Sequence, residues 1–450
     1  MSVKTSNYSN KKKAAPVPPR SGRHSAPPAR LKGTKDIVPE EWRYWRLAVE
    51  KAMQLARIYD FDRLETPLLE PLSLFERSFG KQSEVVQKQL YSFVDRDNEK
   101  VALRSHLKAP LARAVMEHTL VDETKFAKLC MLGPVFRYDR VQSGLARQHT
   151  QWSLDVVGNP SPIADALIIM IGYNFFKELQ LDVRVDINSL GDAECRSAYL
   201  AKLTEFYKEQ TKKLKLPADV KKQLLKHPLE GLLSTDERIM EINEEAPAIV
   251  DFLSEEAKNH FFAIIEHLDA FGVPYNLNAR LFGGADYFGR TVFEFVAPEE
   301  EGRKEIVLGS GGRYDSLFAK LFNQPISAVG FAIGLERTVS RIRSLELPLQ
   351  ESGADIYLAQ LGDGPRQKAL AMFEELRKAG FKVSQGFLHA ALKHQLEEAQ
   401  RMNVRYTLIL GQKELMDGTI IIRDMESGAQ EVVDAKKIIH ELEKRLTSGK

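Results

Sequence analysis

The last hundred residues carry the pattern that most restricts how this 450-residue chain can fold. Strands are predicted over residues 355–360, 381–384 and 406–410, and a helix precedes each of the last two, the second near residues 392–402. Strands that alternate with helices in this way form a parallel sheet with right-handed crossovers. Residues 353–450 are therefore predicted to be a compact α/β domain.

The composition is that of a soluble globular protein, with 43% hydrophobic and 28% charged residues. The net charge of only +2 means that any polyanion must be bound by local basic patches. Cys130 and Cys195 are the only cysteines, too few for a cysteine zinc site or a disulfide framework, which favours a reducing cytoplasm. The longest apolar stretch, near residues 166–176, is too short to span a bilayer, and no secretory signal is visible. We expect a cytoplasmic protein without a membrane span.

Residues 1–32 differ from the remainder of the chain. They contain several lysines, arginines and prolines and no acidic residue. Such a segment cannot bury enough apolar surface to offset its ordering entropy, so it is predicted to be disordered. Two interpretations stay open: a basic arm that adds affinity for RNA phosphates, or a solvated tail without a role.

The predicted secondary structure changes twice between this tail and the C-terminal domain. Residues 33–190 mix short strands and helices, and residues 191–273 are charged helices. Residues 274–345 return to strands, followed by a glycine-rich turn at residues 309–312 and a helix. The simplest organisation is one mixed domain that is interrupted by a helical insertion.

Arginines flank a predicted strand–loop–strand unit that covers residues 133–140 (GPVFRYDR) and 147–151 (RQHTQ). Arginine is the side chain best suited to hold a phosphate through paired hydrogen bonds. A charged hairpin on the surface is the alternative explanation. The stretch resembles motif 2 of class II aminoacyl-tRNA synthetases, above all that of the histidyl enzymes.

A second block, residues 328–337 (AVGFAIGLER), reads as a strand that runs directly into a helix. It is similar to class II motif 3, in which the arginine, here Arg337, contacts the ATP γ-phosphate. No P-loop and no dinucleotide-binding glycine fingerprint is present, so a nucleotide must be held by another device such as this one.

Three shorter blocks extend the resemblance to nearly the whole chain. Residues 286–294 (DYFGRTVFE) and 311–315 (GGRYD) look like the two histidine-specific signatures of the histidyl-tRNA synthetase family. Residues 64–67 (LETP) resemble motif 1, which forms much of the dimer interface in that family. The similarity keeps the family order from about residue 31 to residue 446.

The resemblance implies an α+β fold, in which an antiparallel sheet flanked by helices carries the helical insertion and is followed by a C-terminal anticodon-binding-type domain. It implies a homodimer that uses ATP and Mg²⁺ to convert histidine to histidyl-adenylate and then transfers histidine to tRNA, expected to be tRNA-His. Catalysis is expected to rest on Arg137 and Arg337. The ATP-binding residues expected from the resemblance are Arg137, Asp139, Arg147, His149, Glu336 and Arg337, and the substrate-binding residues are His106, Lys108, Gln151, Asp155, Tyr287, Phe288 and Tyr314.

The sequence departs from the family where the amino acid should bind. Residues 104–108 read RSHLK, whereas the family has Arg-Pro-Glu-Gly-Thr, whose glutamate and threonine receive the substrate ammonium. Gly283 replaces an arginine that stabilises the α-phosphate, and Arg280 is predicted to point to the wrong face of its strand to replace it. Phe288 lacks a tyrosine hydroxyl, and Asp155 is one methylene shorter than the family glutamate.

The ATP-binding half has milder changes. His149 replaces a phenylalanine that stacks on adenine, and Leu145 replaces a loop arginine. Three functions are compatible with these departures: a divergent histidine–tRNA ligase, a non-charging regulatory or tRNA-binding relative, or an enzyme that activates another amino acid, whose acidic group His106 and Lys108 would recognise.

Overall fold

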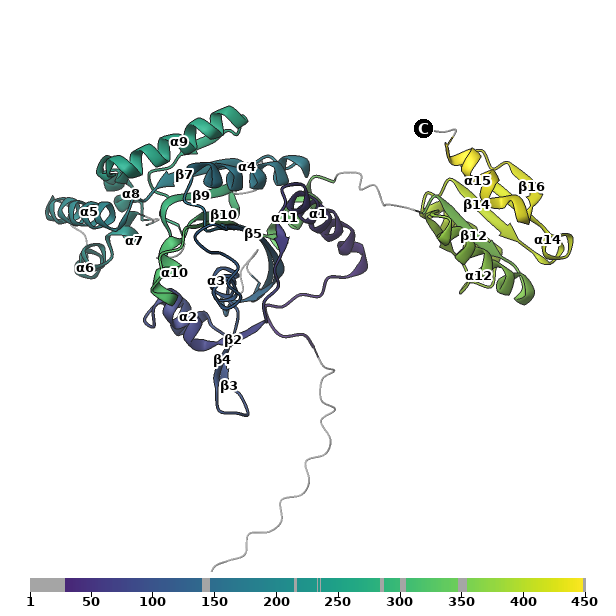
Figure 1. The fold of residues 1–450 in the computed structure, drawn as a ribbon, viewed down its shortest axis with the longest axis horizontal. Helices are drawn as coiled ribbons and strands as arrows, with labels where there is room; N and C mark the ends of the chain where they lie inside the picture. Colours follow the sequence, from purple (N-terminus) through teal and green to yellow (C-terminus); the bar gives the residue numbers. More distant parts are fainter. Residues whose placement is uncertain are drawn as a thin grey trace, which may run out of the picture. The chain divides into compact units, whose positions relative to one another are not determined.

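A computed structural model gives the fold of the protein. It describes residues 29–139, 146–213, 217–232, 234, 236–283, 287–299, 305–346 and 354–447. The predictions for Leu145, for Asp286 and for most of the basic tail therefore lie outside the described residues. The chain divides into two compact units: one contains residues 48–341, and the other contains residues 39–47 and 342–450 (Figure 1).

An eight-stranded sheet forms the centre of the first unit. Its order is β1-β5-β6-β11-β10-β9-β7-β8. Six central strands pair antiparallel, as expected, while β1 pairs parallel with β5 and β8 pairs parallel with β7 at the two edges, which makes the sheet mixed. The strands are β1 (Asp62–Arg63), β5 (Ala127–Phe136), β6 (Gln148–Val157), β7 (Arg184–Ser189), β8 (Tyr275–Leu277), β9 (Gly289–Ala297), β10 (Ile306–Arg313) and β11 (Ala328–Gly334).

The glycine-rich turn predicted at residues 309–312 is wrong, because these residues lie inside β10. A Cβ atom on Gly311 would come within 2.4 Å of the Phe293 ring and 2.5 Å of the Gly330 carbonyl oxygen. Glycine is needed here because the neighbouring strands and their side chains leave no room for a side chain. A run of glycines marks close packing in this sheet rather than a change of chain direction.

Helices α4 (Pro162–Glu178) and α9 (Glu255–Phe271) pack against each other and against β9 (Figure 1). Gly172 of α4 permits this approach, since a Cβ atom there would lie 2.2 Å from the Phe295 ring. The other helical segments of this unit are α2 (Leu72–Phe79), α3 (Lys108–Glu117), α10 (Asp315–Phe322), the π-helical turn η1 (Val85–Gln89), and α1 (Pro39–Ile58) and α11 (Leu335–Ser344), which continue into the second unit.

The segment expected to be a helical insertion consists of helices in the described residues, and its core continues into that of the sheet domain. Tyr199 stacks on Phe282 with ring centroids 5.8 Å apart, and both belong to the same buried cluster as Leu111 of α3. The elements are α5 (Ala193–Lys213), α6 (Ala218–Lys226), α7 (Pro228–Leu232), α8 (Glu237–Glu244) and the 3₁₀ turn η2 (Ile249–Phe252).

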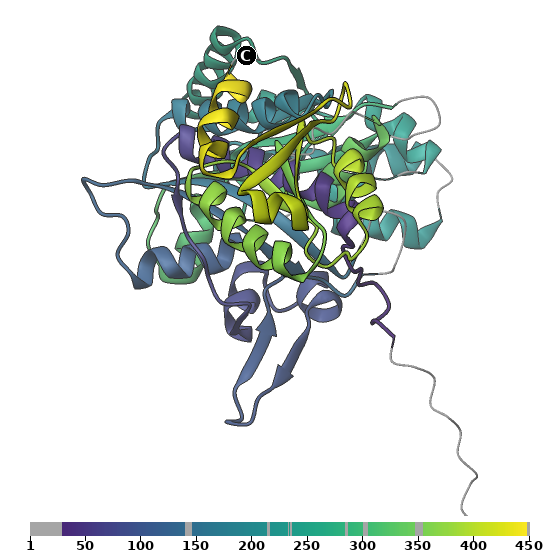
Figure 2. The same ribbon diagram turned by 90° about the vertical axis from the view of Figure 1, so that its right-hand side faces the viewer.

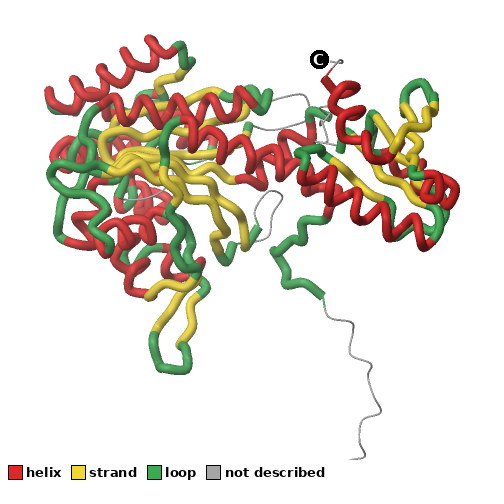
Figure 3. Tube along the Cα trace, turned by 45° about the vertical axis from the view of Figure 1, so that its right-hand side comes forward, coloured by secondary structure: helices red, strands yellow, loops and turns green. Residues whose placement is uncertain are grey.

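A small antiparallel sheet of order β2-β4-β3 projects from this unit as a hairpin arm (Figures 1 and 3). Its exposed apolar side chains include Phe93 and Val94. In the single chain the arm therefore exposes apolar side chains to solvent. The strands are β2 (Leu69–Pro71), β3 (Ser92–Val94) and β4 (Lys100–Leu103).

The second unit contains a five-stranded sheet of order β13-β12-β14-β15-β16 (Figures 1 and 2). The predicted parallel strands are confirmed, because β12 pairs parallel with both β13 and β14. An antiparallel pair, β15 and β16, completes the sheet and was not predicted. The elements are β12 (Ile356–Gln360), α12 (Asp363–Lys378), β13 (Val383–Gln385), α13 (Leu392–Arg401), β14 (Tyr406–Leu410), α14 (Gln412–Asp417), β15 (Thr419–Asp424), β16 (Gln430–Asp434), η3 (Ala435–Lys437) and α15 (Ile438–Thr447). Among the described helices, none combines the length and apolar character needed to cross a membrane.

Candidate active site

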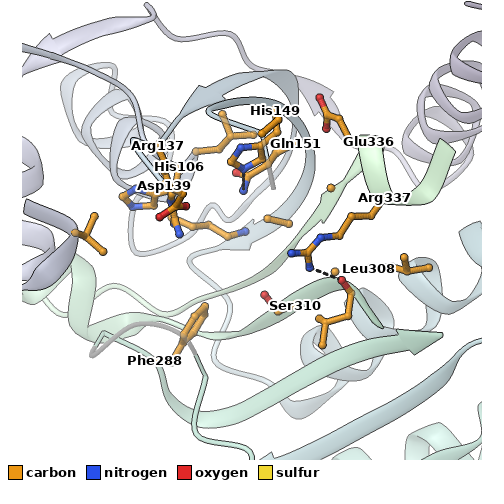
Figure 4. Close-up of a pocket in the computed structure, with 18 of the residues that line it drawn as sticks. His106, Arg137, Asp139, His149, Gln151, Phe288, Leu308, Ser310, Glu336 and Arg337 are labelled. Carbon is orange, nitrogen blue, oxygen red and sulfur yellow. Dashed lines mark hydrogen bonds between the residues drawn. The ribbon is translucent and has the colours of Figure 1, made fainter. Parts of the chain in front are cut away.

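A cavity of about 310 Å³ opens on the first unit, with walls from β6, β10, β11 and the starts of α3 and α11 (Figure 4). It brings together segments that are far apart in the sequence, among them the predicted motif 2 and motif 3 blocks. Most of the expected site residues line it: His106, Lys108, Arg137, Asp139, His149, Gln151, Tyr287, Phe288, Glu336 and Arg337.

Arg137 and Arg337 reach this cavity from opposite sides (Figure 4). Arg137 follows the end of β5, and its Nε donates to the Ser105 carbonyl oxygen at 3.1 Å. Arg337 lies in the first turn of α11, and its Nη1 donates to the Val307 carbonyl oxygen at 2.8 Å. Among the described residues, each guanidinium donates to one backbone carbonyl, which leaves several of its N–H groups for a ligand.

His149 lies between these two charges. Burial, together with the positive charges of Arg137 and then Arg337, lowers the pKa of His149 to about 4. The imidazole is therefore neutral near pH 7, and a neutral ring can stack on a flat base. His149, which stands where the family has a phenylalanine, therefore keeps an uncharged flat ring that can stack on a base.

Two carboxylates also line the cavity. Asp139 lies on the Arg137 side, and Glu336 precedes Arg337 (Figure 4). The Glu336 carboxylate accepts the backbone N–H of Thr150 at 2.8 Å, while burial raises the pKa of Glu336 to about 7. Among the described residues, no cluster of three or more His, Cys, Asp or Glu side chains is arranged to hold a metal ion by itself. Mg²⁺ needs only one or two carboxylates when nucleotide phosphates supply further oxygen ligands, so either carboxylate could supply one ligand to an ion that enters with a nucleotide.

Arg104 organises the wall of the cavity, a role that sequence reasoning missed. Its side chain is buried and donates to the Thr66 carbonyl oxygen at 2.8 Å and to the Pro134 carbonyl oxygen at 2.9 Å. Gly133 makes this possible, because a Cβ atom there would lie 2.3 Å from the Arg104 guanidinium. Arg104 thereby joins the blocks that resemble motifs 1 and 2, next to the Ser105 carbonyl that anchors Arg137.

Lys108, which lines the cavity beside His106, is held by the protein's own acceptors. Its ammonium donates to Ser153 Oγ at 3.0 Å, to the Phe331 carbonyl oxygen at 2.9 Å and to Asp155 Oδ1. Tyr314 donates its hydroxyl to the same Asp155 oxygen at 2.7 Å. Burial lowers the pKa of Lys108, and the carboxylate of Asp155 opposes this effect. The ammonium of Lys108 is therefore part of an internal network of hydrogen bonds.

His106 sits beside this network among aromatic rings. Its ring lies 4.6 Å from that of Phe79 and stacks on Tyr287 at 6.1 Å, measured between centroids. Burial, followed by the charges of Arg137 and Lys108, holds the pKa of His106 well below its usual value, so the ring is neutral. Its Nε2 atom is buried with no hydrogen-bond partner among the described residues. With His106 neutral and the ammonium of Lys108 bound to Asp155, neither side chain presents an unpaired positive charge to an acidic ligand group.

Three of the expected residues do not line the cavity. Asp155 and Tyr314 lie behind Lys108 and contact it instead of the open space. The Arg147 guanidinium is directed elsewhere, toward the Lys32 and Asp139 carbonyl oxygens and the Tyr138 ring. Sequence spacing placed these residues in the correct segments but could not show which way their side chains point.

Nothing in the described residues restores the arginine that the family has at Gly283. Arg280 is exposed and does not line the cavity, as expected, but it lies in a turn after β8, so the predicted strand around it is wrong. Gly283 has a positive φ of 71°, and a Cβ atom there would lie 3.0 Å from the Phe288 ring. Ser310, in β10, also lines the cavity and was not predicted, because its segment was interpreted as a turn.

The mixed sheet, with one arginine from the β5–β6 connection and one from the β11–α11 junction in a single cavity, defines the protein as a class II aminoacyl-tRNA synthetase by fold. A family model described as histidyl-tRNA synthetase matches residues 33–338, and one described as anticodon binding domain matches residues 355–445. The chain belongs to the histidyl-tRNA synthetase family.

Individual relatives agree with this assignment. The chain is 34% identical to the histidine–tRNA ligase of Dehalococcoides mccartyi over 92% of its own length and 99% of the relative. The structure of apo Staphylococcus aureus histidyl-tRNA synthetase matches with a TM-score of 0.73 and 26% identity, over 92% of this chain and 99% of that one. A Bacillus halodurans protein titled ATP phosphoribosyltransferase regulatory subunit/histidyl-tRNA synthetase matches with a TM-score of 0.60 and 21% identity over 85% and 98%, respectively, which shows a shared fold only.

Proposed function

We propose that this protein is a histidine–tRNA ligase that activates histidine with ATP and transfers it to tRNA-His. The observation that carries the proposal is the meeting of Arg137 and Arg337, from distant segments, in one cavity. The near full-length similarity to histidine–tRNA ligases supports the same activity. The site departures noted above make this a divergent member of its family.

The cavity residues suggest how ATP would be held. Arg137 and Arg337 offer guanidinium N–H groups to the phosphates, and the neutral His149 ring offers a face to adenine. Asp139 and Glu336 would hold Mg²⁺ together with the phosphates, and the ion would neutralise charge that develops on them. Such groups act by stabilising the charge of the transition state, so each arginine is expected to affect rate more than folding.

The remaining partners follow from the other parts of the chain. Residues 353–450 match an anticodon-binding model over most of their length, which supports a role in tRNA binding. Exposed apolar side chains on and beside the hairpin arm, including Leu68, Leu69, Phe93 and Val94, support a homodimer that would cover them. The unpaired thiols of Cys130 and Cys195 are compatible with a cytoplasmic protein. We also propose that the chain is organised with the limits predicted from its sequence, namely residues 1–32, 33–190, 191–273, 274–345 and 353–450.

A second function, a tRNA-binding relative that does not charge tRNA, is favoured by one observation. Lys108 and Asp155, which the resemblance assigns to substrate binding, bind each other. The histidine ammonium therefore lacks the glutamate and threonine that the family supplies. ATP would still be bound in this case, because the arginines do not depend on that ion pair.

ATP–pyrophosphate exchange with each proteinogenic amino acid in turn distinguishes the two functions. The ligase predicts exchange with histidine alone, and Arg337→Ala should lower its rate about a hundredfold because a group that stabilises phosphate charge is lost. Arg238→Ala, at an exposed arginine of α8, is the matched control and should exchange normally. No exchange with any amino acid, together with intact tRNA binding, would establish the non-charging function instead.

A further inference from the structure

Two buried side-chain atoms at the wall of the cavity have no hydrogen-bond partner among the described residues. They are His106 Nε2 and Gln151 Oε1. Only 5% of the surface of His106 is exposed, so the protein itself has removed most of the water from its ring. Leaving a buried polar atom unpaired costs free energy, and proteins rarely do so without a reason. An unpaired atom at the wall of a cavity indicates a partner on the ligand.

The hydrogen bonding of the His106 ring defines what that partner is. Its Nδ1 atom lies 3.3 Å from Ser105 Oγ. With the proton on Nδ1, the ring donates to this hydroxyl and Nε2 is a bare acceptor. Burial, followed by the charges of Arg137 and Lys108, holds the pKa of His106 well below its usual value, so Nε2 stays unprotonated. The partner of Nε2 is therefore a hydrogen-bond donor.

The charges around His106 favour an uncharged donor over a cation. The two charges that lower its pKa, those of Arg137 and Lys108, are both positive, and Arg137 lies on the same side of the cavity (Figure 4). Asp155 pairs with Lys108, whereas Arg137 forms no ion pair with the described residues and donates to the Ser105 carbonyl oxygen. A ligand ammonium at Nε2 would be repelled by this guanidinium. A neutral N–H group would not.

Flat rings surround the same atom. Between centroids, the His106 ring lies 4.6 Å from Phe79 and 6.1 Å from Tyr287, and Tyr287 lies 5.0 Å from Phe288. All four rings line the cavity. Such walls suit a flat ligand ring that buries its faces and needs polar partners only at its edge. Burial raises the pKa of Tyr287, so its hydroxyl keeps its proton and can donate. A neutral imidazole, with one N–H and one acceptor nitrogen, matches an acceptor and a donor of this kind.

We propose that His106 is a specificity-determining residue that recognises the side chain of the bound histidine, with its Nε2 atom accepting the N–H of the ligand imidazole. This rests on the proposed histidine–tRNA ligase function and deepens it. The Gln151 amide oxygen remains available to the ligand's ammonium. A position at which the sequence departs from its family thereby supplies recognition of the same amino acid by another contact.

The test compares histidine with β-(2-thienyl)alanine. The two ligands share the ammonium, the carboxylate and a flat aromatic ring of the same size, but the thienyl ring has no N–H. Dissociation constants are measured by calorimetry on the full chain in the presence of a non-hydrolysable ATP analogue. His106→Phe keeps a ring and removes the acceptor, whereas His106→Gln keeps an acceptor oxygen near the position of Nε2. His118→Phe, at the exposed histidine that ends α3, is the matched control.

Wild type and His118→Phe are expected to bind histidine about tenfold more tightly than thienylalanine, because one buried hydrogen bond distinguishes the two ligands. His106→Phe should bind histidine about tenfold more weakly and thienylalanine unchanged, and His106→Gln should keep most of the preference. Equal weakening of both ligands in His106→Phe would overturn the proposal, since Nε2 would then serve the ammonium. A preference that His106→Phe retains, or that His106→Gln loses as fully as His106→Phe, would overturn it too.

The outcome can be separated from that of the proposed function, because binding is measured without catalysis. Histidine binding that depends on His106, without ATP–pyrophosphate exchange, would support this recognition and count against the ligase. Histidine-dependent exchange that His106→Phe leaves unchanged would support the ligase and overturn the role of His106, and so would thienylalanine binding as tight as that of histidine in wild type. Circular dichroism and thermal melting show that each variant is folded. His106→Leu, which is smaller and also lacks the acceptor, replaces His106→Phe if that variant does not fold.

Discussion

The two ends of the cavity use charge in opposite ways. At the end proposed to bind the nucleotide, Arg137 and Arg337 line the open space, and each donates to one backbone carbonyl among the described residues. At the end proposed to bind the amino acid, the ammonium of Lys108 donates to three acceptors of the protein itself. Both ends contain buried or half-buried cations, so the number of charges does not distinguish them. The difference is whether the hydrogen-bonding capacity is left for a ligand or is already used.

This contrast explains how family membership and local divergence can coexist. The fold and the arginine positions depend on the sheet and on backbone carbonyls, whereas the amino-acid end depends on a few side chains. A charged side chain whose hydrogen bonds all go to the protein helps to hold the fold together and can no longer bind a ligand through those groups. The following experiments examine that division, beginning with the largest expected effect.

Removing the partner of Lys108 should have the largest effect on stability. Asp155→Ala leaves a buried ammonium without its carboxylate and is expected to lower the free energy of unfolding by about 3–5 kcal/mol. Urea denaturation measures this change, with Asp182→Ala, at an exposed aspartate, as the control. The double variant Lys108→Met with Asp155→Asn should lose much less. Similar losses in Asp155→Ala and the control would mean that the amino-acid end is not held by this ion pair.

The nucleotide end should respond to pH through Glu336. Its pKa is raised to about 7, so the carboxyl is mostly protonated below that pH and Mg²⁺ must displace the proton. Mg²⁺-dependent ATP affinity is therefore expected to fall about tenfold between pH 8 and pH 6. His149, with a pKa of about 4, stays neutral throughout this range.

Glu336→Gln supplies the reference for that measurement. The glutamine keeps the size of the side chain and does not titrate, so subtracting its pH profile removes the titration of ATP itself. Fluorescence titration with a labelled ATP analogue gives both profiles. Parallel profiles for wild type and Glu336→Gln would show that this carboxyl does not take part in nucleotide binding.

The smallest effect is expected from the basic N-terminal segment. Its deletion should end at residue 28, because the carbonyl oxygens of Lys32 and Gly33 accept hydrogen bonds from Arg147 at 3.2 and 2.7 Å. Folding should be unchanged, while tRNA affinity at low salt should fall by about a fewfold and its dependence on salt should weaken. Filter binding at several salt concentrations measures both. Identical salt slopes would assign no role in RNA binding to this segment.

The sequence predicted the segments of the site better than the direction of individual side chains. The β5–β6 and β11–α11 positions follow from local periodicity and from a strong family pattern, and both arginines lie where these predict. The partners of Lys108 could not be predicted, because Asp155 is distant in sequence and becomes a neighbour only when the fold brings β6 to the first residue of α3. The run of glycines at residues 309–312 has the composition of a turn, and only the facing Phe293 and Gly330 reveal why a strand needs it.

Gly283 also limits which side chains its position can carry. An arginine there would have to adopt a left-handed backbone conformation, and its Cβ would press against the Phe288 ring. Engineering a guanidinium into this part of the chain therefore requires a second change, one that first gives the ring room to move.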